Sequence, residues 1–165
     1  MKHVLYTTQG FTLIEILTAV IIVAILVVMA MPLYEKTIER SHLAEVRTIL
    51  AKLQDAKIQT MDNMGCTEYT AANVTAGTCP GMQHLNVAFA TTATGTTATT
   101  KDFKYTLVSA TYPNAVCAKR LNGEYANTTF VYQGSAVDGS NSFMKCSGIN
   151  CENYGFVNET FSCTF

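Results

Sequence analysis

The sequence predicts an α+β fold, with one long N-terminal helix followed by a sheet-rich second half. Residues 11–31 form an almost unbroken apolar run, after which apolar residues recur at helical spacing to about residue 63. Segments that alternate apolar and polar residues, as strands do, appear only after residue 100. All six cysteines lie after residue 65. The two halves of the chain are therefore expected to lie in different surroundings.

The apolar run, FTLIEILTAVIIVAILVVMAM, carries a single charge, Glu15. As a helix it would span roughly 30 Å, about the thickness of a bilayer core. A short polar leader, residues 1–10, precedes it. The length and composition of the run predict either a transmembrane helix or a signal peptide.

The helix is expected to continue beyond the run, with a kink at Pro32, because proline removes a backbone donor and clashes with the preceding turn. We expect one helix from about residue 11 to about residue 63, ended by Met64-Gly65. Its second half is amphipathic and offers one stripe to a globular region. The expected stripe consists of Ile38, Ala44, Val46, Ile49, Leu50, Leu53, Ala56 and Ile58.

Three strands are predicted in the second half, at residues 102–111, 115–120 and 128–133, with a turn at 121–124 between the last two. The Thr-rich segment 91–100 is interpreted as a plain loop, with an exposed strand or a glycosylation target as alternatives. The tail, residues 146–165, is expected to be a loop that disulfides attach to the sheet.

The six cysteines are Cys66, Cys79, Cys117, Cys146, Cys151 and Cys163. An even number of cysteines downstream of an export-type segment indicates a disulfide framework outside the cytoplasm. A zinc site is the alternative, but neither a CxxC nor a His-x-x-x-His spacing is present. Sequence alone leaves the pairing open; our preferred hypothesis joins Cys66 to Cys79 and lets the other four hold the C-terminal tail.

Composition argues against several functions. The net charge of −1 gives no electrostatic reason to expect nucleic acid as a specific partner. His42 and His84 are isolated in the sequence, without a Ser or Asp at a telling spacing. We therefore predict no catalytic residue, no cofactor and no metal site.

Glu15 is the most informative residue of the apolar run. A carboxylate at membrane depth costs roughly 2.5–3.5 kcal/mol, so it needs a partner. The run contains no Lys, Arg or His. A cut between Gly10 and Phe11 would create an α-amino group at that depth, and this amine on a neighbouring copy could neutralise Glu15 and set the register of assembly. The competing interpretation is an ordinary signal peptide cut after Ala30, which would release a secreted module.

The hexapeptide GFTLIE at Gly10–Glu15, the apolar helix and Pro32-x-Tyr34 together resemble the class III signal of type IV pilins and pseudopilins. The resemblance implies that a prepilin peptidase cleaves after Gly10 and N-methylates Phe11. It implies that Glu15 contacts the Phe11 amine of an adjacent subunit and that Pro32 marks a segment that can unwind in the fibre. The implied fold is a long helix packed on an antiparallel sheet of about four strands, with a cysteine-bounded C-terminal loop.

The expected function is that of a structural subunit of a type IV pilus-like filament, not an enzyme. Alternatives are a pseudopilin or minor pilin of a type II secretion or competence system, and a secreted or membrane-anchored binding module. The expected organisation is a leader (1–10), a transmembrane and filament-core half-helix (11–31), an amphipathic half-helix (32–64) and a β-rich head (65–165).

The expected partners are copies of the chain itself, the inner membrane, the prepilin peptidase and an assembly machinery. The precursor is expected to lie in the inner membrane with its head outside the cytoplasm, and the mature form in a filament at the cell surface or across the periplasm.

Overall fold

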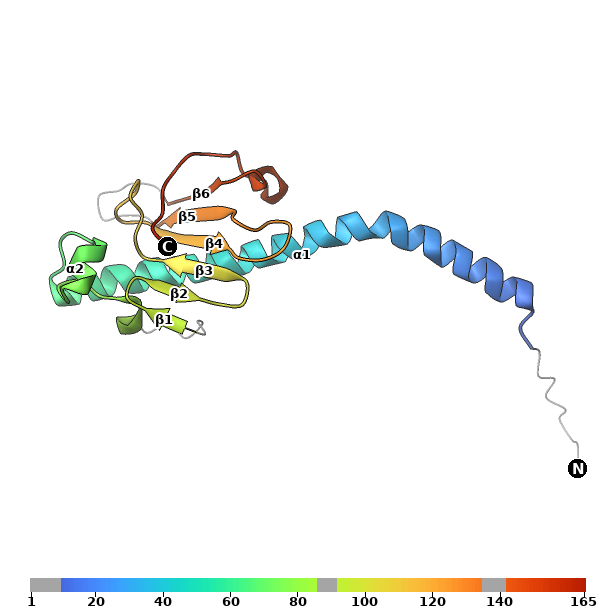
Figure 1. Ribbon diagram of the computed structural model, residues 1–165, viewed down its shortest axis with the longest axis horizontal. Helices are drawn as coiled ribbons and strands as arrows, with labels where there is room; N and C mark the ends of the chain where they lie inside the picture. The colour runs from blue at the N-terminus through green and yellow to red at the C-terminus, as the bar shows by residue number, and fades with distance from the viewer. Residues whose placement is uncertain (1–9, 86–91, 135–141) are drawn as a thin grey trace, which may run out of the picture. The chain divides into compact units, whose positions relative to one another are not determined.

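The computed structural model describes residues 10–85, 92–134 and 142–165 (Figure 1). The chain divides into two compact units, residues 1–39 and 40–165. The helices are α1 (Leu13–Met64), α2 (Ala71–Thr75) and the short 3-10 helices η1 (Met82–His84) and η2 (Cys151–Tyr154). The strands are β1 (Thr92–Thr94), β2 (Thr97–Thr99), β3 (Phe103–Thr106), β4 (Val116–Arg120), β5 (Thr129–Gln133) and β6 (Phe143–Ser147).

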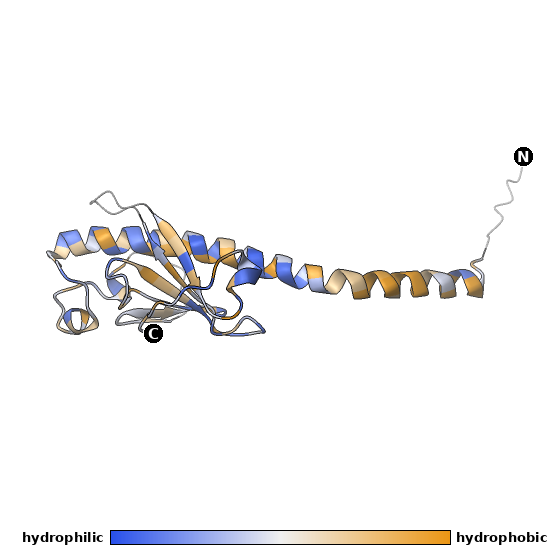
Figure 2. Ribbon diagram, turned by 90° about the horizontal axis from the view of Figure 1, so that it is seen from above, coloured by the Kyte–Doolittle hydropathy of each residue, from blue (hydrophilic) through white to orange (hydrophobic). Residues whose placement is uncertain are grey.

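In the first unit, the described residues consist of the start of α1 and the three residues before it. From residue 16 to residue 31, α1 carries no charged side chain and is apolar on all sides (Figure 2). It contains a window of 18 residues apolar enough to cross a membrane, and none of that window is buried in the protein. The α-helix passes through Pro32 without ending. The predicted continuation of the helix beyond the apolar run is therefore confirmed.

In the second unit, α1 buries one face. Val46, Leu50 and Leu53 are fully buried, as predicted, and Ile49, Ala56 and Ile58 are partly buried. The prediction was wrong for Ile38 and Ala44, which are exposed. Ile38 belongs to the first unit, outside the globular core. Ala44 lies two positions from Val46, so it points to roughly the opposite side of the helix.

The end of α1 has a local cause. Gly65 adopts φ +67°, the left-handed conformation that stops a helix with little strain when the residue is glycine. Cys66 N donates to Met61 O at 2.9 Å, and Gly65 N donates to Asp62 O at 3.3 Å. These two bonds form a Schellman motif, which satisfies carbonyls that the helix end would otherwise leave free.

The sheet of the described residues is antiparallel and has six strands in the order β1-β2-β3-β4-β5-β6. The predicted strands are confirmed as β3, β4 and β5, with β3 shorter than expected. The count of about four was too low. The Thr-rich segment forms the hairpin β1–β2 rather than a plain loop, and β6 begins before the tail that was expected to be irregular.

The second unit has two apolar clusters, one on each face of the sheet. Ala118 and Phe130 pair across β4 and β5 and pack in the cluster that contains the buried face of α1. The adjacent pair, Cys117 and Val131, belongs to the other cluster. Since neighbouring residues of a strand point to opposite faces, α1 covers one face of the sheet. On the other face, the second cluster includes Phe161, Cys163 and Phe165 of the C-terminal tail.

Candidate functional site

The predicted processing residues, Gly10 and Phe11, lie just before α1, which begins at Leu13. Thr12 caps the helix, because its Oγ1 accepts a hydrogen bond from the backbone N of Glu15 at 3.3 Å. Gly10 and Phe11 precede this cap in non-helical backbone, and both are exposed. The peptide bond between Gly10 and Phe11 therefore lies outside the helix, in exposed backbone.

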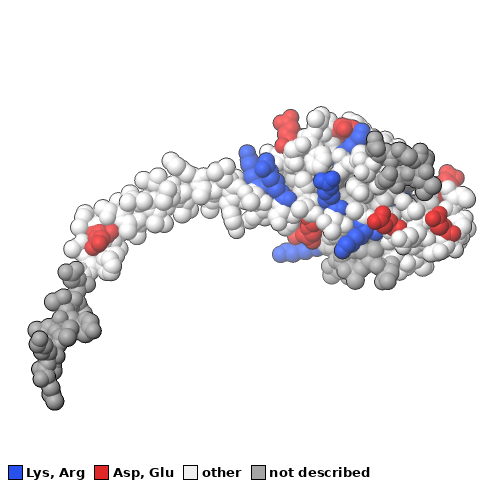
Figure 3. All heavy atoms as spheres, turned by 180° about the vertical axis from the view of Figure 1, so that it is seen from behind, with Lys and Arg blue, Asp and Glu red and all other residues white. Residues whose placement is uncertain are grey.

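Glu15 lies in the first turn of α1, where the positive end of the helix dipole favours a carboxylate. It is exposed, and within the described ranges no Lys, Arg or His forms an ion pair with it. Figure 3 shows a white, uncharged surface along this part of α1, interrupted by acidic atoms near its start. We call residues 13–31 of α1 the apolar rod; its one charged side chain is the carboxylate of Glu15.

The apolar side chains of the rod are open to the surroundings. Leu13 is 85% exposed and Val28 75% exposed. Soluble monomeric proteins rarely expose contiguous apolar patches above a few hundred Å². We therefore expect lipid or other apolar helices to cover these side chains.

An apolar helix of membrane-spanning length with a separately folded globular unit is consistent with a membrane-anchored precursor. Residues 7–31 match the family described as the prokaryotic N-terminal methylation motif. The segment is a class III prepilin signal of type IV pilin-like proteins, and it supports a pilin-like or pseudopilin role. Proteins of this type are structural rather than enzymatic. No curated protein and no solved structure matches the chain.

Three disulfides join the six cysteines: Cys66–Cys79, Cys117–Cys163 and Cys146–Cys151. The first is the local pair that we preferred from sequence, and the other two involve the C-terminal tail. Cys117–Cys163 ties the tail to β4, and Cys146–Cys151 closes a short loop after β6. Because every cysteine is paired, the zinc alternative has no thiolate ligand.

Sequence reasoning missed a buried cation, Lys57. It is fully buried, and its Nζ donates to the carbonyls of Leu107 at 2.8 Å, Pro113 at 3.1 Å and Ala115 at 3.1 Å. The same Nζ lies 4.2 Å from the centre of the Tyr69 ring. Three acceptors match the three donors of an ammonium group, and the ring face adds a cation–π contact.

Burial lowers the pKa of Lys57 from 10.5 to about 7. The helical spacing contained a signal for this site, since Lys57 follows Leu50 by seven residues and Leu53 by four, and so lies on the buried stripe. Its partners come from the connection between β3 and β4, which periodicity along α1 cannot reveal.

The two histidines take local roles. His84 Nδ1 accepts a hydrogen bond from Gly81 N at 3.0 Å, and the ring of His42 lies 6.4 Å from that of Phe103. Neither contact places a nucleophile beside an imidazole.

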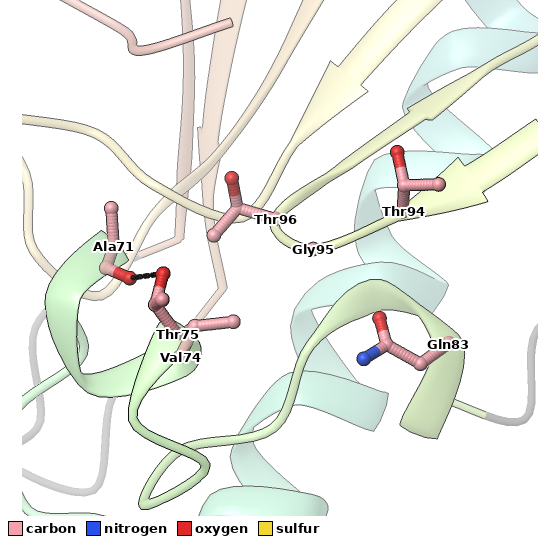
Figure 4. Close-up of a pocket in the computed structure, with 7 residues that line it drawn as sticks. All are labelled: Ala71, Val74, Thr75, Gln83, Thr94, Gly95 and Thr96. Atoms are coloured by element: carbon pink, nitrogen blue, oxygen red, sulfur yellow. Dashed lines mark hydrogen bonds between the residues drawn. The ribbon is translucent and has the colours of Figure 1, made fainter.

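A cavity of about 550 Å³ lies between α2 and the β1–β2 turn (Figure 4). Its lining residues are Ala71, Val74, Thr75, Gln83, Thr94, Gly95 and Thr96, none of which titrates near neutral pH. Thr75 Oγ1 donates to Ala71 O at 2.9 Å, so this hydroxyl is already engaged within α2. The lining offers no acid, base or activated nucleophile for catalysis.

Proposed function

We propose that the chain is a structural subunit of a type IV pilus-like filament and has no active site of its own. The observation that carries the proposal is the exposed apolar rod of α1, which follows a methylation motif and bears Glu15 as its sole charge between residues 11 and 31. In this proposal prepilin peptidase removes residues 1–10 and methylates Phe11. Residues 11–31 anchor the precursor in the inner membrane and later line the filament core.

Glu15 sets the register of assembly in this proposal. A carboxylate surrounded by apolar side chains is stable only beside a cation, and the new α-amino group of Phe11 on a neighbouring copy supplies one. Transfer from lipid to a bundle of identical helices exchanges one apolar environment for another, so the apolar contribution to assembly is small. Filament growth therefore depends on the Glu15 pair, on packing and on an assembly machinery.

Pro32 has a separate role in the proposal. It removes one backbone hydrogen bond from α1 at the boundary between the apolar run (11–31) and the amphipathic part (32–64), so α1 can bend or unwind there at low cost when subunits pack. Residues 65–165 form the head, which faces the outside of the filament.

The three disulfides of the head favour a long-lived subunit at the cell surface over a short-lived periplasmic pseudopilin, because each cross-link stabilises the domain against unfolding. The alternative of a module released after Ala30 is less favoured, since α1 runs unbroken through residues 28–31 and the carboxylate of Glu15 would then lie in a discarded segment.

The mature N-terminus tests the proposal. Mass spectrometry of the exported protein is expected to find N-methylated Phe11 as the first residue. A first residue near Met31, or an intact Met1, would refute it.

Assembly is tested by Glu15→Val, which is expected to insert into the membrane normally and to be processed, yet to give few or no filaments. Glu35→Val, which removes a carboxylate from the same helix outside the apolar run, is the matched control and is expected to assemble. Normal filaments from Glu15→Val would contradict the register role.

A further inference from the structure

The described residues outside α1 include two large hydrophobic side chains that are mostly exposed, Ile149 at 94% and Val157 at 80%. They lie on neighbouring segments. Gly148 N donates to Asn158 Oδ1 at 3.0 Å, and Glu159 N donates to Cys146 O at 2.9 Å. The two apolar side chains therefore belong to two hydrogen-bonded segments that follow β6.

This region is held rigidly. The Cys146–Cys151 disulfide closes the loop that carries Ile149, and Phe156 N donates to Cys151 O at 3.0 Å. Gly148 adopts φ +131°, and a Cβ there would lie 3.3 Å from Thr128 Cα, so the loop lies tightly on the preceding connection. A preorganised loop loses little conformational entropy on binding, which favours a docking role.

Two exposed glutamates lie on this loop or on the segment that contacts it. Glu152 lies three residues after Ile149 in η2, and Asn150 Nδ2 donates to the backbone O of Glu124 at 3.1 Å. Both glutamates are exposed, and within the part of the chain that the structure describes neither forms an ion pair. We call Glu124, Ile149, Glu152 and Val157 the loop surface.

A surface of matching chemistry lies on the first unit. Met29, Leu33 and Lys36 follow one another at i, i+4 and i+7 on α1 and so share one helix face. Met29 is 68% exposed, Leu33 is 69% exposed, and Lys36 is exposed with no ion pair among the described residues. We call these three residues the helix stripe. It combines apolar area with a positive charge, the complement of the loop surface.

We propose that the loop surface of one copy docks on the helix stripe of a second copy, with Ile149 and Val157 on Met29 and Leu33, and Glu152 beside Lys36. The proposal rests on the proposed function, because it places the contact between subunits of a filament. The two surfaces are different patches of one chain, so the contact is head-to-tail. Such a contact does not close into a dimer by itself and propagates into an open polymer.

Zero-length carbodiimide cross-linking of native filaments tests the contact, because this reagent joins a carboxylate to an amine only when the two touch. Filaments grown from equal amounts of ¹⁵N-labelled and unlabelled chains are expected to give a Glu152–Lys36 peptide that pairs a labelled with an unlabelled half. If other cross-links between copies form but neither Glu152 nor Glu124 is ever cross-linked to Lys36, the docking proposal is overturned. The proposed function as a filament subunit is unaffected by that result.

Charge reversal gives a second readout. Glu152→Lys and Lys36→Glu are each expected to lower the yield of filaments roughly two- to fivefold, and the double variant is expected to restore it. Lys52→Glu, at another exposed lysine of α1, is the matched control and is expected to assemble as the native chain does. Native yields from both single variants would overturn the docking proposal. Absence of filaments from the processed native chain would instead overturn the proposed function, and the docking proposal with it.

Discussion

Replacing Lys57 with methionine removes the cation that binds the connection between β3 and β4 to α1. Methionine has nearly the same length, so the change removes the charge and the donors with little change in volume. The carbonyls of Leu107, Pro113 and Ala115 then lose their ammonium donor. This contact also holds the tail indirectly, because Ala110 N, on the same connection, donates to Ser162 O at 3.0 Å.

The expected cost follows from these contacts. Each buried carbonyl that loses its donor costs about 1–3 kcal/mol, and burial of the methionine side chain returns roughly 1.5–3 kcal/mol. Near pH 9.5, where the lowered pKa of Lys57 leaves only a small cost of burying the side chain, we expect a net loss of about 3 kcal/mol in the free energy of unfolding of the globular unit. Lys52→Met, at an exposed position of the same helix, is the matched control and should change stability by less than about 0.5 kcal/mol.

The assay is urea denaturation of the detergent-solubilised full chain with its disulfides intact, followed by near-ultraviolet circular dichroism of the eight tyrosines. If Lys57→Met and Lys52→Met unfold at the same urea concentration with the same slope, the three hydrogen bonds do not stabilise the fold as argued.

The lowered pKa of Lys57 fixes the sign of the pH dependence of the free energy of unfolding. The pKa of Lys57 is about 7 in the folded protein and 10.5 as its ordinary value, so between these pH values the unfolded chain binds more protons. The free energy of unfolding should therefore rise with pH in this window, by at most about 1.4 kcal/mol per pH unit. Well below pH 7 both states are protonated and the contribution is constant.

The pH effect is best measured as the difference between the native chain and Lys57→Met. Burial raises the pKa of Tyr69 and of Tyr105, so above about pH 10 the unfolded chain loses tyrosine protons that the folded protein retains, and stability falls. The informative range is therefore about pH 7.5–9.5. A difference that stays flat across this range would contradict the assigned pKa.

Two further predictions concern the covalent and backbone features of the head. Replacing both cysteines of Cys117–Cys163 with alanine should lower the free energy of unfolding by about 4 kcal/mol, and the same change at Cys146–Cys151 should lower it by about 2 kcal/mol. The difference arises because the first disulfide closes a loop of 46 residues and the second a loop of 5. Equal losses in urea denaturation would contradict this chain-entropy argument. Gly65→Ala should lower the free energy of unfolding by about 1–2 kcal/mol, because alanine is strained at φ +67°. The control is Ala44→Gly on the exposed face of α1, which should lower the free energy of unfolding by at most about 1 kcal/mol. A stabilised Gly65→Ala variant would show that the Schellman motif does not end the helix.

The helix and the central strands could be predicted because their signals are local. The repetition of Val46, Leu50 and Leu53 is visible along the chain, and so is the alternation of Phe103, Tyr105 and Leu107. The local cysteine pair is also visible, since Cys66 and Cys79 are separated by only 13 residues.

The hairpin β1–β2 could not be predicted in this way. Its residues are threonine and alanine, so the sequence lacks the contrast between apolar and polar positions. Ala98 is buried because it pairs with Tyr105 of β3, whose large side chain belongs to the core. This pairing is not visible from the small side chain of alanine in the sequence. Lys57 escaped prediction for a similar reason, because its acceptors lie 50 or more residues away in sequence.

The ammonium of Lys57 does what a bound metal ion does in many extracellular domains, which is to draw carbonyl oxygens from a folded-back segment around one positive centre. Here the positive centre is covalently part of α1. Its occupancy therefore does not depend on the ion content of the medium, and a chelator cannot extract it. Only the proton concentration controls whether the site is filled.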